Sequence, residues 1–451
     1  MSKVVTRFPP SPTGYFHIGS ARTALFNYLF AAHHGGVMYF RFEDTDIERS
    51  KKEFEDDIVQ GIEWLKIPYA WPDIRRQSER TAVYRGYVKT LIDAGAAYEA
   101  EAATDDPSKK VVRFKNPNTT ITFNDLVRGE VTFKTDELKD FVIARSVTDP
   151  LYHLAVVIDD HDTGVTHVIR GEDHISNTPR QILILEALGF ERPQYAHIPL
   201  ILAPDRSKLS KRHGAVSVNE YRAQGFLPEA IVNYLALLGW NPGGEQELFT
   251  MQEMVEQFDI SHVQKAGAIF DIEKLKWFNR EHLLRLRADD FNEEVLRILE
   301  EELQKRNHAW NENVAHKLIH VVRERISTWQ DLRTMVADGE LDFFFSDPEL
   351  VASDISQKGS SAAVAAKHLE AVSGFIQGIS DADISDAEKA RSAIWPYADK
   401  EGRGEVLWPL RYALSGKKKS PDPFTIMSAV GKEVSLRRIR TAIDALGRAG
   451  Q

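Results

Sequence analysis

The first 95 residues alternate between two hydrophobic patterns. Continuous apolar runs at Val4–Phe8 and Val37–Phe42 predict buried strands, and apolar residues from Ala24 to Leu29 recur at helix spacing between them. Two further amphipathic helices are expected, at 54–65 and at about 80–94. Strands that alternate with helices in this way are typical of a doubly wound parallel sheet. We therefore expect an α/β fold for this part of the chain.

The pattern changes at about residue 96 and changes back near 149. Short apolar runs separated by Pro, Asn and Gly predict a small α/β or β-rich insertion over 96–148. Strand and helix patterns return over 149–238, where 196–202 forms one apolar run. The sequence therefore predicts two halves of one sheet with an insertion between them.

Helical periodicity dominates the rest of the chain. We expect a loop and helices over 239–285 and only helices over 286–451, including a single helix at 314–335. A chain of 451 residues is long enough for two to four domains. The predicted architecture is thus α/β, with an inserted small domain and an all-helical C-terminal half.

Composition excludes several kinds of chemistry. The chain has no cysteine, which rules out disulfides, thiol catalysis and cysteine-ligated metal sites. No apolar run reaches the ~18 residues of a membrane span and no signal-peptide pattern is visible, so we expect a cytoplasmic protein with no membrane partner. The net charge is −10, yet net charge says little about a local binding face. Basic clusters that fit an elongated RNA-binding track lie at 206–212, 274–287, 417–419 and 437–440.

The first chemical signal follows the first predicted strand. A proline-rich turn at 9–14 leads into His17-Ile18-Gly19-Ser20, where a helix begins. A helix N-terminus directs backbone N–H groups at one point, where a phosphate can bind, and Gly19 permits close approach. The alternative is an ordinary strand–turn–helix with a structural histidine.

The second signal is Lys208-Leu209-Ser210-Lys211-Arg212, after an apolar run and a turn. Two lysines three residues apart on a loop can close on the β- and γ-phosphates of ATP as charge moves onto pyrophosphate. The alternative is a solvated basic loop.

Taken together, the two signals resemble the paired signature motifs of class I aminoacyl-tRNA synthetases. The surrounding sequence is similar to glutamyl-tRNA synthetases of bacterial type, over nearly the whole chain and most densely up to about residue 279. The segments that carry this similarity are 7–14, 41–46, 152–155, 168–174 and 177–180.

The resemblance implies an architecture and a reaction. It implies Rossmann halves at 1–95 and 149–238, an acceptor-stem-binding insertion at 96–148, a stem-contact domain at 239–285 and a helical anticodon-binding region at 286–451. The implied reaction attaches L-glutamate to the 3′ end of tRNA(Glu) through glutamyl-adenylate, and it leaves open whether tRNA(Gln) is also charged. We expect a monomer.

The resemblance also assigns roles to single residues. Arg7 and Arg170, each at the end of a predicted strand, would bind the carboxylates of glutamate, because arginine binds carboxylates bidentately. Glu43 would bind its amino group, and Ser11 and Tyr152 would add hydrogen bonds. The catalytic residues would be His17, Lys208 and Lys211. The ATP-binding residues would be Pro12, Gly14, His17, Gly19, Ser20, Lys208, Leu209 and Lys211.

ATP with Mg²⁺ is the expected cofactor, and we predict no zinc. Many bacterial relatives carry a cysteine-rich zinc knuckle where this chain has a short acidic stretch, 98–111. Asp44 and Asp46 are interpreted as a turn-capping pair and not as metal ligands. Val156 and Val147-Thr148 depart from the family pattern, which leaves part of the hydrogen bonding to glutamate open.

Four alternative functions fit the sequence less well. Glutaminyl-tRNA synthetase differs at the positions of Ser11 and Thr13 and has a β-barrel anticodon region. The paralogue that glutamylates a base in tRNA lacks an anticodon domain. A small-molecule adenylyltransferase would need no helical annex, and a non-enzymatic RNA-binding paralogue would have lost the histidine or the lysines.

Overall fold

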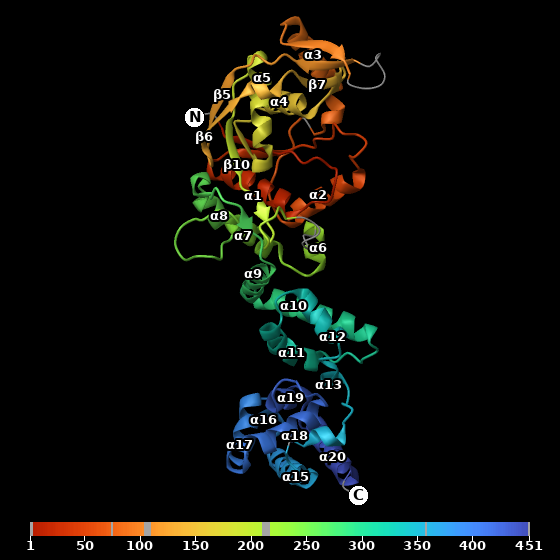
Figure 1. Cartoon of the computed structure of the whole chain (residues 1–451). Helices are drawn as coiled ribbons and strands as arrows, with labels where there is room; N and C mark the ends of the chain where they lie inside the picture. Colours follow the sequence, from red (N-terminus) through yellow and green to blue (C-terminus); the bar gives the residue numbers. More distant parts are fainter. Residues whose placement is uncertain (1–2, 74, 103–109, 210–216, 357–358, 450–451) are drawn as a thin grey trace. The chain divides into compact units, whose positions relative to one another are not determined.

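A computed structural model describes residues 3–73, 75–102, 110–209, 217–356 and 359–449 (Figure 1). The chain forms two compact units, Met1–His282 and Leu283–Gln451, which are described separately below. The subdivision of the N-terminal unit into smaller domains stays a prediction.

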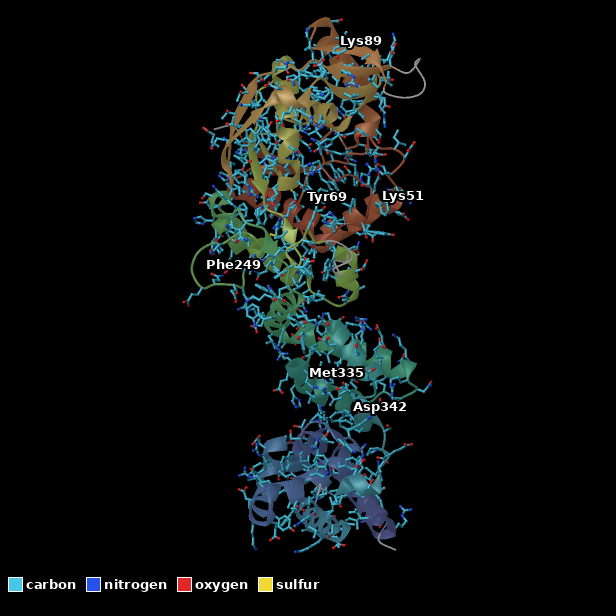
Figure 2. All side chains as sticks on the ribbon, viewed as in Figure 1. Lys51, Tyr69, Lys89, Phe249, Met335 and Asp342 are labelled. Atoms are coloured by element: carbon cyan, nitrogen blue, oxygen red, sulfur yellow. The ribbon has the colours of Figure 1, made fainter. Side chains whose placement is uncertain are left out.

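The N-terminal unit opens with the expected strand–helix–strand. Strand β1 (Val5–Phe8) pairs in parallel with β2 (Val37–Phe40), and helix α1 (Ile18–His33) connects them. One face of α1 is fully buried against this pair, as the apolar spacing predicts. Beside β2, Tyr69 (labelled in Figure 2) packs edge-on against Phe40 and Trp71.

The remaining helices and strands of this unit follow in chain order. They are α2 (Lys52–Trp64), α3 (Thr81–Asp93), β3 (Ala97–Glu101), β4 (Lys110–Phe114), β5 (Thr120–Asp125), β6 (Gly129–Lys134), β7 (Phe141–Ser146), β8 (Asp149–Pro150), α4 (Tyr152–Asp162), β9 (His167–Gly171), α5 (Thr178–Ala187), β10 (Gln194–Ile198), β11 (Ile201–Leu202), α6 (Val218–Ala223), α7 (Pro228–Leu237), α8 (Met251–Gln257), β12 (Ala268–Ile269) and α9 (Ile272–Arg285).

The second half of the sheet adds to the first through β9. Strands β9 and β10 run in parallel, and the Thr166 N–H, next to β9, donates to the Val5 carbonyl of β1 over 2.9 Å. This arrangement and the helical C-terminal unit confirm the predicted fold class. The apolar run at 196–202 is not one strand, however. Pro199 has no N–H to donate to a ladder, so β10 ends before it and β11 pairs with β12 instead.

The predicted insertion is divided between two sheets. Strands β3, β4, β7 and β8 form an antiparallel sheet of their own. The hairpin β5–β6 instead extends the sheet of β9 and β10, because β5 pairs in parallel with β10. The carboxyl end of β5 therefore lies beside the strands that carry the predicted site.

The C-terminal unit is helical throughout its described residues. Its helices are α10 (Ala288–Lys305), α11 (Glu312–Arg325), α12 (Trp329–Ala337), α13 (Asp342–Phe345), α14 (Ala352–Ile355), α15 (Ala362–Gly378), α16 (Asp381–Ile384), α17 (Ala387–Glu401), α18 (Arg403–Ser415), α19 (Pro423–Val430) and α20 (Lys432–Ala449). The single helix expected at 314–335 is two helices, because Thr328 and Asp331 form a capping box that starts α12. In the part of the chain that the structure describes, no helix is both long and apolar enough to cross a bilayer.

Candidate active site

A cavity of about 880 Å³ opens at the carboxyl ends of β1 and β9, beside the N-terminus of α1. This is the edge where parallel α/β sheets bind ligands. Its lining includes most of the residues singled out from the sequence: Arg7, Ser11, Gly14, His17, Gly19, Ser20, Glu43, Tyr152, Arg170, Lys208 and Leu209.

Of the other two predicted residues, one is placed away from the cavity and one is not described. Pro12 is buried and does not line the cavity; its carbonyl accepts a hydrogen bond from the Lys51 N–H over 3.0 Å. Pro12 thus shapes the turn instead of facing the hollow. Lys211 lies outside the described residues, so its predicted role stays a prediction.

His17 is itself the N-cap of α1. Its Nδ1 accepts the Ser20 N–H over 3.2 Å, so that amide is not free for a ligand as the sequence suggests. The neutral ring then carries its proton on Nε2. Enclosure in the cavity and the nearby Lys208 ammonium lower the pKa of His17, while Asp173 opposes them. His17 is therefore a neutral N–H donor at the cavity wall, where its Nε2 lies 3.2 Å from the Ser20 hydroxyl.

The two signature segments meet at this wall. Lys208 lies on the cavity lining, where its Nζ is 2.8 Å from Asp173. Where the described chain resumes, Ser217 pairs with His17, and the Val218 N–H donates to the Phe16 carbonyl over 2.8 Å. Segments nearly 200 residues apart in sequence thus line one hollow.

A buried ion cluster also borders the cavity, which Arg7 and Glu43 line. Asp160 on α4 bridges two arginines, 3.2 Å from Arg7 Nε and 2.7 Å from Arg41 Nη2. Arg41 also pairs with Glu43 over 3.1 Å. Arg7 is only 2% exposed, and its Nη1 has no hydrogen-bond partner among the described residues. A buried donor of this kind is costly without a partner, which suits it to binding a ligand.

The pKa values of the two acids in this cluster move in opposite directions. Burial raises the pKa of Glu43 to about 7, against the pull of Arg41 and Arg7. Burial also acts to raise the pKa of Asp160, but there the two arginines outweigh it and hold the pKa below its ordinary value. Asp160 is therefore the permanent counter-charge, whereas Glu43 titrates near neutrality.

Arg170 differs from Arg7 in its partners. It is buried at the end of β9 and donates to Thr178 and Gln181 over 2.8 Å each, and to His197 Nε2 over 3.2 Å. These bonds use three of its five N–H donors, all on uncharged groups. Arg170 thus brings a positive charge to the cavity, and none of the described carboxylates forms an ion pair with it.

Several residues around the site were missed from the sequence. Asp160 and Arg41 hold Arg7, Asp173 pairs with Lys208, and His174 lines the cavity 3.4 Å from the Tyr152 hydroxyl. No local pattern marks Asp160, because its partners Arg7 and Arg41 are far away in sequence. Asp46 accepts the Arg49 N–H over 3.3 Å, as a turn-capping residue does, whereas Asp44 accepts hydrogen bonds from the backbone and side chain of Ser78, which is far away in sequence.

Family models match almost the whole chain. One describes the catalytic domain of class I tRNA synthetases (E and Q) and matches residues 3–107 and 99–277. Another describes an anticodon-binding domain and matches residues 286–443.

Named relatives agree with these models. The glutamate–tRNA ligase of Aquifex aeolicus is 39% identical over 99% of this chain and 100% of its own length, and that of Desulforamulus reducens is 38% identical over 97% and 99%. A crystal structure of a glutamate–tRNA ligase from Elizabethkingia meningosepticum, in complex with its amino acid, has a TM-score of 0.87, with 32% identity over 99% of this chain and 100% of that one. The chain therefore belongs to the glutamate–tRNA ligases, within the class I aminoacyl-tRNA synthetases.

Proposed function

We propose that this chain attaches L-glutamate to the 3′ end of tRNA(Glu) in two steps. As a class I synthetase it uses ATP. The glutamate α-carboxylate attacks the α-phosphorus to give glutamyl-adenylate and pyrophosphate, and a terminal ribose hydroxyl of the tRNA then displaces AMP. The observation that carries the proposal is a single cavity whose lining includes groups suited to phosphate, His17 and Lys208, and groups suited to an amino acid, Arg7, Arg170 and Glu43.

The groups suited to phosphate would act by aligning ATP and stabilising its charge. The His17 Nε2–H and the Lys208 ammonium would donate to ATP oxygens, and Lys208 would exchange Asp173 for a phosphate. Lys211 would join them on leaving pyrophosphate. None of these groups needs to form a covalent bond to the substrate.

Arg7, Arg170 and Glu43 would bind the two carboxylates and the ammonium group of glutamate. The Arg7 Nη1 that lacks a partner and the remaining donors of Arg170 would bind its carboxylates. Glu43, in its ionised form, would pair with the ammonium group. Ser11 and Tyr152 would complete the hydrogen bonds from the cavity wall.

The residues present suit Mg²⁺ that enters with ATP. Among the described residues no three His, Asp or Glu side chains are grouped to hold a metal, and the Asp173 carboxylate is paired with Lys208. We therefore assign Mg²⁺ to the triphosphate, whose charge it would neutralise. The absence of zinc, a monomeric state and a cytoplasmic location stay predictions.

The direct test is transfer of labelled glutamate and glutamine to purified tRNA(Glu) and tRNA(Gln). We expect ATP-dependent glutamate transfer to tRNA(Glu) and no glutamine transfer to either tRNA. Glutamate transfer to tRNA(Gln) would define the chain as one that charges both tRNAs. Glutamine transfer would favour the glutaminyl alternative, and the absence of any transfer would reject the proposal.

Glutamate use should depend on pH through Glu43. Because the pKa of Glu43 is raised to about 7, its ionised form is lost as the pH falls through that value, and the ammonium group of glutamate loses its partner. We expect kcat/KM for glutamate to fall below pH 7, by up to about tenfold per unit. Steady-state aminoacylation between pH 5.5 and 8.5 measures this. Glu43→Gln should give a lower and flatter profile, whereas an unchanged inflection in that variant would exclude Glu43 as its source.

A further inference from the structure

A buried chain of polar side chains runs from the inserted hairpin to Arg170. Asp125, at the end of β5, lies 2.6 Å from Nδ1 of His197 on β10. Both residues are almost completely buried. Nε2, on the other side of the imidazole, lies 3.2 Å from Arg170 Nε and 3.0 Å from the Thr178 hydroxyl. Neither Asp125 nor His197 lines the cavity.

The hydrogen bonds leave one protonation state for His197. Arg170 Nε can only donate, so Nε2 must accept and the ring proton must be on Nδ1. The Asp125 carboxylate accepts a hydrogen bond from this Nδ1–H and also from the backbone N–H groups of Val127, Arg128 and His197. Four donors on one carboxylate keep it ionised and immobile.

The same geometry fixes the direction of Arg170. Its Nη2 donates to Thr178 Oγ1, whose hydroxyl can then donate to Nε2 of His197, which closes a ring of hydrogen bonds. A proton on Nε2 would place two donors opposite each other and push the guanidinium out of position. Asp125 therefore determines, through His197, how Arg170 faces the cavity.

We propose that Asp125 and His197 are positioning residues for glutamate: Asp125 holds the proton on Nδ1, so that Nε2 presents a lone pair to Arg170 and fixes its guanidinium in the cavity wall. The inference rests on the proposed role of Arg170 as a ligand of a substrate carboxylate. Residues that orient the groups that touch the substrate are a common requirement of precise sites.

The test compares two substitutions of His197 in the full-length enzyme. His197→Phe removes the acceptor, whereas His197→Gln keeps a neutral oxygen near the position of Nε2. We expect His197→Phe to raise the KM for glutamate about 10- to 100-fold, as for a lost hydrogen bond to a charged group. We expect the KM for ATP to stay within about twofold, and His197→Gln to restore the KM for glutamate to within about threefold of wild type. Steady-state aminoacylation at saturating tRNA gives both constants.

Arg170→Gln separates the proposed role of Arg170 in binding glutamate from the positioning role of His197. If it raises the KM for glutamate and His197→Phe does not, the positioning role is wrong while the role of Arg170 stands. If Arg170→Gln leaves that KM unchanged, both are wrong. The inference would be overturned if His197→Phe raised the KM for glutamate and the KM for ATP equally, or if His197→Gln did not restore the KM for glutamate. Either result would indicate that His197 is merely structural. Should His197→Phe not fold, Asp125→Asn decides by the same glutamate-specific rise in KM or its absence.

Discussion

Replacing His17 with alanine should lower kcat for aminoacylation by about 10²- to 10³-fold, the usual effect of removing a preorganised donor to developing charge. His17 is held as a neutral donor at the cavity wall, where Nδ1 accepts the Ser20 N–H and the Nε2–H lies 3.2 Å from the Ser20 hydroxyl, a bond that a phosphate oxygen would replace. The KM for glutamate should change little, because other residues of the cavity lining, Arg7, Arg170 and Glu43, would bind glutamate. Steady-state kinetics with each substrate varied in turn measures the two effects.

His17→Asn is the matched control for helix stability. His17→Ala also removes the N-cap of α1, which costs about 0.5–2 kcal/mol. Asparagine is a good N-cap residue but is too short to replace the imidazole Nε2–H, so this variant should recover thermal stability without recovering the rate. A wild-type rate in His17→Asn, or a kcat for His17→Ala close to that of the wild type, would remove histidine from the chemistry.

Asp160→Asn should produce the largest loss of stability. The asparagine keeps the shape of Asp160 but leaves Arg7 and Arg41 with one negative charge too few inside the protein. Removing one partner of a buried ion pair costs about 3–5 kcal/mol. Urea unfolding of the full chain, followed by hydrogen exchange in peptides that cover β1 and α4, isolates the N-terminal unit from the C-terminal one.

Asp162→Asn provides the comparison on the same helix. Asp162 is partly exposed and pairs with Arg80, so its loss should cost about 1 kcal/mol or less. If the two variants lost the same amount of stability, the buried ion cluster would contribute no more to stability than a partly exposed ion pair. A stable Asp160→Asn protein with an unchanged KM for glutamate would mean that Arg7 needs no counter-charge.

The layout of the site could be predicted because it follows from local patterns. Arg7, Glu43 and Arg170 each stand at or just after the end of an apolar run, and parallel strands share their carboxyl edge. The sequence could therefore place all three in one crevice before any contact was known. The meeting of His17 with Lys208 came from the resemblance, since no local pattern relates segments so far apart.

The features that were missed depend on long-range pairing or on caps. The alternation of apolar and polar residues in β5 does not show which strand it pairs with. Asp125 could therefore not be connected with His197 on β10. The break between α11 and α12 could have been predicted, because Thr328 and Asp331 have capping-box spacing. The helical periodicity of 314–335 masked that signal, as the apolar run at 196–202 masked the effect of Pro199.

The pairing of β5 with β10 has a consequence for chimeric enzymes. A graft of residues 96–148 from a relative would exchange the β5–β6 hairpin at the edge of the sheet of β9 and β10, together with the Asp125 carboxylate that accepts a hydrogen bond from His197. Altered amino-acid selectivity in such a hybrid would then arise from the transplanted hairpin itself, even if the graft were meant to change only how the nucleic acid is held. A graft that leaves 119–135 native would keep the two effects apart.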